Sequence, residues 1–298
     1  VSKTVERRFG VIGAVKNIGT VDVCAQLTDL GQSTGAPKIC IVRETPTPVV
    51  EKVSDASPDS LSQHKIRLFD AIRDFERQQV DVLILPSFGA HVFLDELRPE
   101  IRLPVVDLMA ALRAYVEKHH PNVSRIGVLT SDFVEKHGLF ERYFATPRWQ
   151  TIHAKPEMRQ GIPWLSHCEG NEVESELASG MVVDLLEQAC RDLLSRGAEI
   201  ILPGAAGIAS LAEMLKERGM PVLNVNRIHA RHAIEVGGEP VVRPFKIGVV
   251  GGVGPAATVD FYSKIVRNTP ARRDQEHIKV VVEQNPQIPD RTENLIGT

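Results

Sequence analysis

The sequence predicts an α/β protein with parallel sheets, followed by the beginning of a second copy of the same fold. Short β-branched runs alternate along the chain with longer segments of helical periodicity, which is typical of strands joined by crossover helices. The run at 80–85 is apolar except for Asp81, as expected of a strand buried on both faces of a parallel sheet. Residues 9–22 (FGVIGAVKNIGTVD) and 247–260 (IGVVGGVGPAATVD) also align without a gap at an offset of 238.

The aligned segments share seven of fourteen residues, and a second apolar run follows each of them, KICIVRE at 38–44 and IKVVVEQ at 278–284. A period this long indicates tandem domains, because solenoid repeats are roughly 20–50 residues long. We expect a first domain at 1–236, a linker at 237–245 that contains GGEPVVRP, and the N-terminal part of a second domain at 246–298. The second copy stops before the pattern is finished, so we expect a shortened form of a longer protein.

Periodicity places the elements of the first domain in order. Strands are expected where β-branched residues cluster, at 9–15, 38–43, 80–85, 104–106, 125–129, 199–202 and 222–225. Helices are expected where apolar residues recur at helical spacing, at 21–30, 61–79, 92–97, 108–118, 134–144, 172–196, 208–218 and 228–236. Residues 145–171 lack periodicity and are predicted to form a loop over a cleft.

The alternation of strands and helices restarts near residues 119–124, which predicts two lobes. The lobes are expected to be pseudo-symmetric and Rossmann-like, to span about 9–118 and 125–223, and to face each other across a cleft. The last strand and helix are expected to return to the first lobe. Ligands of parallel α/β sheets bind at the carboxyl ends of the strands, so the residues that follow each strand are the candidates for a site.

Composition narrows the class of protein. The net charge of −3 gives no electrostatic reason to expect a nucleic-acid or membrane partner. Apolar runs fall short of the ~20 residues that cross a bilayer, and the N-terminal VSKTVERR is too polar for a signal peptide. Four scattered cysteines (Cys24, Cys40, Cys168 and Cys190) form no disulfide or CxxC pattern, which favours a reducing, cytoplasmic compartment.

The motifs that follow the predicted strands are specific enough to indicate a protein family. The second copy carries GGVGPAAT at 251–258 and DQEHIKVVVEQNPQIPDRT at 274–292. These segments resemble the opening of an aspartate/glutamate racemase-family domain, whose pattern is GGMGPxAT, a DxxH strand entry and NPxIPDRT. The first copy resembles the same family more weakly over its whole length. Its segment 80–97 matches the family's Cys-Asn-Thr-Ala-His region, and its segment 198–211 matches the Gly-Cys-Thr-Glu region.

The resemblance implies a chemistry. Members of this family racemise acidic amino acids without pyridoxal phosphate, so no cofactor is expected. Two cysteines face each other across the site; one removes the α-proton as a thiolate while the other returns a proton to the opposite face. A thiol suits this work because its pKa of ~8.5 can be tuned toward the working pH. Backbone amides and hydroxyls near each cysteine hold the carboxylates of the substrate.

The first copy departs from the family pattern at the two decisive positions. Ser87 stands where the first cysteine is expected, and Ala205 stands where the second is expected. A serine hydroxyl is a poor base without a neighbouring general base, and alanine has no proton to exchange. The first copy also replaces the glycine-rich turn by GAVKNIGT and the IPDRT segment by TPTP at 45–48. We therefore interpret it as a degenerate copy, in which Gly89, Ala90 and Ala206 are the remaining candidates for ligand contact.

The second copy keeps the substrate-side motifs. The residues that the resemblance assigns to substrate binding are Gly252, Gly254, Pro255, Thr258, Asn285 and Arg291. Arg291 is the candidate partner for a side-chain carboxylate, since a guanidinium can bind a carboxylate through two hydrogen bonds. The sequence stops before either catalytic cysteine of this copy, so neither copy contains a complete racemase site.

Two functions follow as alternatives. The first is a tandem racemase of an acidic amino acid, with two-base proton transfer in the second domain of the full-length protein. The second is a degenerate module that binds a small carboxylate or dicarboxylate or serves as a scaffold, with a homodimer as one arrangement. A third alternative is that 246–298 completes a partner chain by swapping.

Other interpretations of single motifs carry less weight. Gly252, Gly254 and Ala257 also fit a dinucleotide-binding turn, but Glu283 lies further along the chain than the ~20 residues expected for the ribose-binding acid. Ser87, His91 and Asp107 suggest a hydrolase triad, but they lack the G-x-S-x-G elbow; His91 is interpreted as a structural hydrogen-bonding residue. His229 and His232 lie three residues apart without an evident third ligand, so no metal site is expected.

Overall fold

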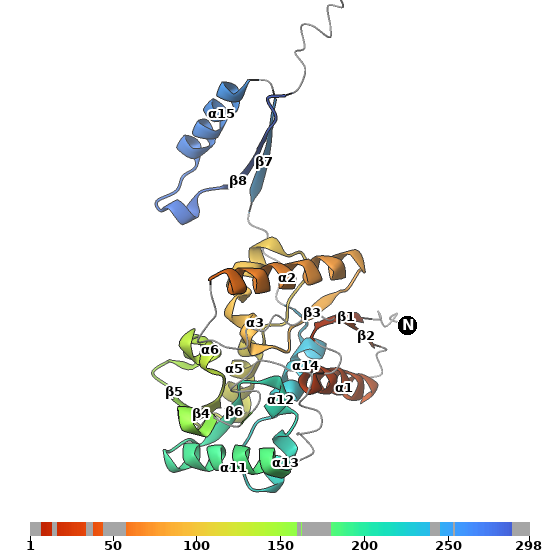
Figure 1. Ribbon diagram of the computed structural model, residues 1–298, viewed down its shortest axis with the longest axis vertical. Coiled ribbons are helices and arrows are strands. Elements are labelled where there is room, and N and C mark those ends of the chain that lie inside the picture. Colours follow the sequence, from red (N-terminus) through yellow and green to blue (C-terminus); the bar gives the residue numbers. More distant parts are fainter. Residues whose placement is uncertain are drawn as a thin grey trace, which may run out of the picture. The chain divides into compact units, whose positions relative to one another are not determined.

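The computed structural model describes residues 7–13, 17–33, 38–43, 58–159, 162, 180–238, 245–252 and 254–287. Contacts between Cα atoms divide the chain into two compact units, Val1–Val241 and Val242–Thr298 (Figure 1). The first unit contains two small parallel sheets and the helices that cover them, which confirms the predicted α/β class. The pseudo-symmetry of its lobes and a cleft between them stay predictions.

The first sheet is formed by three parallel strands in the order β2-β1-β3. They are β1 (Arg7–Ile12), β2 (Lys38–Arg43) and β3 (Val82–Ile84). Phe9 of β1 pairs with Cys40 on one side and with Val82 on the other. The strand predicted at 104–106 is reduced to a single bridge between Val105 and Leu83. β1 is therefore the central strand of this sheet.

The second sheet has the order β5-β4-β6 and is also parallel. Its strands are β4 (Arg125–Leu129), β5 (Gln150–His153) and β6 (Ile200–Pro203). β5 and the following helix α8 (Pro156–Arg159) lie inside the predicted loop at 145–171, so that prediction is wrong for these two elements, while residues 160–161 and 163–171 lie outside the described residues. Only Ile152 of β5 is buried, and a four-residue strand with one buried side chain gives no periodic signal.

Among the described residues, thirteen helical elements accompany the sheets of the first unit and two belong to the second unit. Those of the first sheet and its connections are α1 (Ile18–Ser33), α2 (Pro58–Arg77), α3 (Phe88–Val92), α4 (Leu94–Leu97), the 3-10 helix η1 (Arg98–Glu100) and α5 (Leu108–His119). Those that follow are α6 (Asp132–Lys136), α7 (Leu139–Phe144), α8, α11 (Gly180–Ser195), α12 (Ala206–Ala209), α13 (Ala212–Glu217) and α14 (Val225–Glu235). The helix predicted at 134–144 is split into α6 and α7, because Gly138 adopts a left-handed conformation with φ +61°.

Helices cover both faces of the first sheet. Phe9 and Val11 of β1 pack with α1 and with Ala230 and Ala233 of α14 on one face. Gly10 points to the other face, where a Cβ atom would meet Phe75 of α2. The closing helix α14 therefore packs on the first sheet.

The strand predicted at 222–225 does not join the first sheet together with α14. Val222 bridges Ile201 of β6 and so extends the second sheet, which corrects that part of the predicted domain organisation. Val225 already begins α14. The largest core cluster contains side chains from β3, β4 and β6 together with Phe133 and Phe140, so the two sheets share one continuous core.

The second unit is a strand–helix–strand arrangement. β7 (Lys246–Gly251) pairs in parallel with β8 (Lys279–Gln284), and α15 (Pro255–Asn268) and the 3-10 helix η2 (Asp274–Glu276) connect them. α15 has no buried residue, and Val250 of β7 is 87% exposed. Of the helices that the structure describes in either unit, none is long and apolar enough to cross a membrane.

Candidate functional site

The carboxyl edges of the two sheets meet in the first unit. A Cβ atom on Gly19, at the start of α1 after β1, would overlap Ala206 at the start of α12 after β6. A Cβ atom on Gly89, in α3 after β3, would lie 3.8 Å from Phe133 of α6, which follows β4. The loops that follow four strands of two sheets thus lie side by side, which is the usual place for a ligand in α/β proteins.

Ser87 caps the helix that it precedes. Its backbone is extended, with φ −74° and ψ 123°, and its Oγ accepts a hydrogen bond of 3.4 Å from the backbone N–H of Ala90. The side chain of Ala90 is 4% exposed and its N–H donates to Ser87, and contact between Ala90 and a ligand stays a prediction. Gly89 remains partly exposed beside the serine hydroxyl.

Ala205 occupies the corresponding position before α12. Its backbone is extended and it makes no side-chain capping bond. Ala206 follows it, and its carbonyl accepts a 3.0 Å hydrogen bond from Nδ2 of Asn226, which also donates to Oδ2 of Asp22 at 2.7 Å. Asn226 is 3% exposed, so this amide ties the start of α12 to α1 and α14.

His91 has a structural role, which confirms its interpretation from sequence. Its Nε2 accepts a 3.0 Å hydrogen bond from the backbone N–H of Leu108, and the ring is 2% exposed. Burial lowers the pKa of His91 to about 4, so the ring is neutral near pH 7. A neutral ring with Nε2 as acceptor carries its proton on Nδ1, which leaves no free basic nitrogen for Ser87.

Asp107 belongs to the same buried network and is fully engaged there. Its carboxylate accepts hydrogen bonds from the N–H of Ala110, from Arg98 at 2.8 Å and from the hydroxyl of Tyr143 at 2.8 Å. Burial acts to raise the pKa of Asp107, but these donors and nearby positive charge together hold it below its ordinary value. The structure does not assemble the alternative Ser87–His91–Asp107 triad, because each of the three groups is committed to a structural hydrogen bond.

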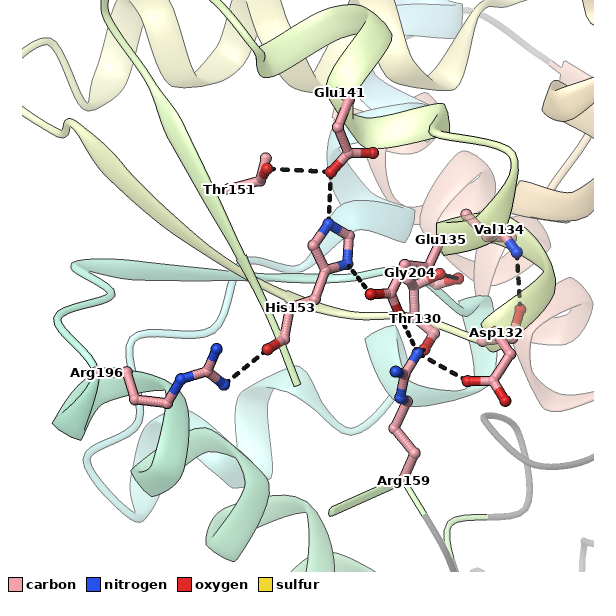
Figure 2. Close-up of polar contacts among 11 residues, drawn as sticks. Thr130, Asp132, Val134, Glu135, Glu141, Thr151, His153, Arg159, Arg196 and Gly204 are labelled. Carbon is pink, nitrogen blue, oxygen red and sulfur yellow. Dashed lines mark hydrogen bonds and ion pairs between the residues drawn. The ribbon is translucent and has the colours of Figure 1, made fainter. Parts of the chain in front are cut away.

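A second polar cluster lies at the carboxyl edge of the second sheet (Figure 2). Arg159 is 7% exposed and forms ion pairs with Glu135 and, at 2.9 Å, with Asp132, while it donates to the carbonyl of Thr130 at 3.5 Å. The hydroxyl of Thr130 donates to the carbonyl of Gly204, next to Ala205. The buried guanidinium is thereby paired with two carboxylates, and it joins α6 to the residue that follows β4.

His153 extends this cluster to α7. Its Nε2 lies 2.5 Å from Oε1 of Glu141, which also accepts a hydrogen bond from Thr151 at 3.1 Å (Figure 2). Burial acts to raise the pKa of Glu141, but the hydrogen bond from His153 leads the effects that bring it below its ordinary value. Within the described residues, no group of three or more His, Cys, Asp or Glu side chains is arranged to hold a metal ion.

The thiols of the described chain lie away from Ser87 and Ala205. Cys24 is on α1, Cys40 is on β2, and Cys190 is buried on α11, where burial raises its pKa to about 12. Cys168 lies outside the described residues. The positions at the starts of α3 and α12 therefore present a serine hydroxyl and a methyl group.

The second unit brings several of its predicted residues together. Gly254 precedes α15 and Pro255 is its first residue, as the fixed φ of proline favours. The N–H of Asn285 donates to the carbonyl of Gly251 at 3.0 Å, which places the end of β8 beside the turn that contains Gly252. Thr258 packs on Gly251, where a Cβ atom would overlap its hydroxyl. Arg291 lies outside the described residues.

Sequence reasoning missed three residues that organise the first unit. Asn226 follows the predicted strand at 222–225, so the rule of examining residues after strands could have found it. Tyr143 gave no signal, because a tyrosine on a helical face is usually part of the core. Arg159 follows β5, and missing that strand concealed it.

Two parallel sheets whose carboxyl edges meet over short helix starts define the first unit as an α/β domain. Comparison with known proteins makes the class more specific. The model of the Asp/Glu/hydantoin racemase family matches residues 10–233. The chain belongs to this family.

Solved structures of similar fold agree with this assignment. An aspartate racemase from Picrophilus torridus is 12% identical, with a TM-score of 0.59 and coverage of 79% of this chain and 96% of that one. An aspartate racemase homologue from Pyrococcus horikoshii is 15% identical, with a TM-score of 0.56 and coverage of 78% and 100%. A glutamate racemase from Francisella tularensis, in complex with D-glutamate, is 12% identical, with a TM-score of 0.54 and coverage of 94% and 97%. At these identities the likeness concerns the fold.

Proposed function

We propose that the first unit is a racemase-family domain that binds a small carboxylate and does not transfer protons between two thiols. The observation that carries this proposal is the pair of residues at the starts of α3 and α12. Ser87 uses its hydroxyl to cap a helix, and Ala205 has no ionisable group. The family fold is kept around both positions, including the contacts between Gly19 and Ala206 and between Gly89 and Phe133.

Racemisation needs a base on one face of the α-carbon and an acid on the other. A serine hydroxyl becomes a base only when a neighbouring group accepts its proton. His91, the nearest histidine along the chain, is neutral and its Nε2 is already an acceptor for Leu108. A methyl group at Ala205 can neither accept nor return a proton. The site therefore supports binding better than catalysis by two thiols.

The proposed ligand is an acidic amino acid or a related dicarboxylate. The family description names aspartate, glutamate and hydantoin as its substrates. The hydroxyl of Ser87 and the backbone near Gly89 and Ala206 are the groups through which this unit would hold a carboxylate. They stand where loops from both sheets meet, so a small ligand would be held from two sides.

Isothermal titration calorimetry with aspartate, glutamate and succinate tests this proposal on the full chain. A Cβ atom on Gly89 would meet Ser87 Oγ at 3.5 Å and Phe133 at 3.8 Å, which are ordinary contacts, so a side chain there fits the fold while it fills the space beside Ser87. Gly89→Leu is expected to abolish binding heat. Gly180→Leu is the matched control, because a Cβ atom at Gly180 has no neighbour within 4 Å among the described residues. Absence of heat with every ligand for the unmodified chain would contradict the proposal.

A second candidate is racemisation of an acidic amino acid by a domain that residues 246–298 begin. The contact between Asn285 and Gly251 favours it, because it joins the glycine-rich turn to the NPQIPDRT segment that the family uses on the substrate side. This candidate requires two cysteines in a continuation of the chain. Mass spectrometry of the protein isolated from its natural source would test it, since a polypeptide that ended at Thr298 would lack both cysteines.

A further inference from the structure

Two thiols on different elements of the first unit lie side by side. Cys24 is on the second turn of α1 and Cys40 is in the middle of the edge strand β2. Their Sγ atoms are 3.1 Å apart, whereas a disulfide bond is ~2.05 Å long. A relative movement of about 1 Å would bring the sulfur atoms to bonding distance. The spacing of the two residues along the chain gives no hint of this contact.

The surroundings of the pair hold both side chains in place while leaving them partly exposed. Cys24 and Cys40 both pack against the cluster of Phe9, Val23 and Leu27. Cys40 is fixed in register opposite Phe9 of β1. Both cysteines are only partly buried, so a small reagent can reach them, whereas Cys190 is completely buried.

The two thiols are also electrostatically unequal. Either thiol can donate the hydrogen bond between the two sulfur atoms, and this contact lowers the pKa of Cys24 below its ordinary value although burial opposes the change. The same hydrogen bond, together with burial, raises the pKa of Cys40. Cys24 is thus the thiol that ionises first. Thiolates are the form that attacks disulfides, so Cys24 is placed to react first with an oxidant.

We propose that Cys24 and Cys40 are a redox pair that forms a reversible intramolecular disulfide between α1 and β2. The oxidant is a low-molecular-weight disulfide such as oxidised glutathione. The Cys24 thiolate attacks one glutathione sulfur, forms a mixed disulfide and releases the first glutathione thiol. Cys40 then gives its proton to solvent, attacks Cys24 Sγ and releases the second glutathione. Two protein thiols are oxidised by two electrons, and one glutathione disulfide is reduced to two thiols.

The order of these steps is consistent with the charges. Once Cys24 is bonded to glutathione it no longer carries the negative charge that holds the proton on Cys40, so Cys40 becomes a better nucleophile in the second step. The new bond would join α1 to β2 close to the start of α1, where Gly19 contacts Ala206. The proposal does not depend on what ligand the first unit binds.

The test is oxidation of the full chain with oxidised glutathione, followed by alkylation of the remaining thiols and peptide mass spectrometry without reduction. The expected result is a peptide that links Cys24 to Cys40, the loss of two of the four thiols, and their recovery with dithiothreitol. Cys190→Ala and Cys168→Ser are the control variants, and both are expected to form the same link. A link between other cysteines, or no link in excess oxidised glutathione, would overturn the proposal.

Single variants test the order of attack. Cys40→Ser is expected to accumulate glutathione on Cys24, because the second step is blocked. Cys24→Ser is expected to react at Cys40 at least several-fold more slowly, because it removes the group that reacts first. The rate at which glutathione modifies Cys40 in the Cys24→Ser variant is compared with the rate at which it modifies Cys24 in the Cys40→Ser variant. If Cys40 reacts faster, the assigned order is wrong. Thermal unfolding of both reduced variants establishes that they remain folded.

Discussion

The end of the first strand and the start of the first helix, together called the corner below, bring the same two residue types into contact in both units. A Cβ atom on Gly13 would overlap the hydroxyl of Thr20, and a Cβ atom on Gly251 would overlap the hydroxyl of Thr258. The threonine at the start of the helix thus packs directly on the last glycine of the strand region in both copies. A side chain larger than that of glycine would clash with this threonine in either copy.

Beyond the corner the two units differ. Ile12 of β1 is 5% exposed, because helices cover its sheet on both faces, whereas the matching Val250 of β7 is 87% exposed. Asp22 accepts a hydrogen bond from the buried amide of Asn226, whereas the matching Asp260 pairs with Lys264 one turn along its own exposed helix. The comparison teaches that the local sequence is sufficient to form the glycine–threonine contact at the corner. Burial of the strand and of the helix depends on partners that lie far along the chain.

The largest effect expected from this comparison is on the folding of the separate units. Residues 1–241 alone are expected to unfold cooperatively, with a free energy of unfolding in the usual range of about 5–15 kcal/mol. Residues 242–298 alone are expected to show no cooperative transition, because α15 buries no residue and a two-stranded sheet is marginal in water. Circular dichroism during urea and thermal unfolding measures both, and a cooperative transition of 242–298 alone would contradict the comparison.

The next effect is a pH dependence of stability that arises in the first unit. Burial lowers the pKa of His91 to about 4 and that of His229 to about 3, against 6.5 in the unfolded chain. Between pH 6.5 and 4 the unfolded chain binds protons that the folded unit does not. As the pH is lowered from 6.5 to 4, the free energy of unfolding should therefore decrease, by up to about 1.4 kcal/mol per pH unit for each histidine.

Urea unfolding at pH 7, 6 and 5 measures this dependence. The window from 6.5 to 5 separates the histidines from Asp107, because the pKa of Asp107 is held low and its contribution is lost only at more acidic pH. His91→Gln, which keeps an acceptor for the N–H of Leu108, is expected to reduce the slope, and the exposed His119→Gln is the control. Equal stability at pH 7 and pH 5 would show that these buried rings are not held neutral.

A matched pair of core substitutions gives the third effect. Val11→Ala leaves a cavity between β1 and its covering helices, and is expected to lower the free energy of unfolding by about 1–3 kcal/mol. Val249→Ala substitutes the matching residue of the second copy, whose side chain is only partly buried. This variant is expected to lower the free energy of unfolding by less than about 0.5 kcal/mol. Equal losses for the two variants, measured by urea unfolding of the full chain, would mean that the second unit buries its strand as the first one does.

The smallest effect concerns the shared aspartate. Asp22→Ala removes an acceptor from the buried amide of Asn226 and is expected to cost about 1 kcal/mol of stability. Asp260→Ala removes only an exposed ion pair with Lys264 and should cost about 0.3–0.5 kcal/mol at most. The difference between the two variants, measured by denaturant unfolding, should disappear in an Asn226→Ala background, and a difference that persists there would assign the effect to another contact.

The sequence was sufficient for the class of fold and for the regular elements. Strands such as β4 and β6 and helices such as α5 carry strong periodic signals, and the structure places them within a few residues of prediction. It was not sufficient for β5, which buries a single isoleucine, or for Gly138, whose left-handed conformation divides a helix that periodicity runs through. Positions of Ser87 and Ala205 at helix starts followed from the family resemblance, because the motif boundaries coincide with the ends of strands.

Tertiary contacts account for the rest. The amide of Asn226 meets Asp22 from 204 residues away, and the thiols of Cys24 and Cys40 meet because α1 packs along β2. Such contacts depend on how helices are placed on sheets, and a single sequence contains no periodic signal for them. Arg159 illustrates the same point, since its three partners come from the loop after β4 and from α6.

The most direct test of the proposed function is proton NMR of the full chain with L- and D-aspartate and L- and D-glutamate in D2O. Loss of the α-proton signal reports removal of that proton, whichever residue acts as the base. The absence of two ionisable groups at Ser87 and Ala205 predicts no loss above a protein-free control for any of the four compounds, even where calorimetry shows binding. Exchange above the control that disappears in Ser87→Ala would contradict the account, because it would show that the serine is an active base.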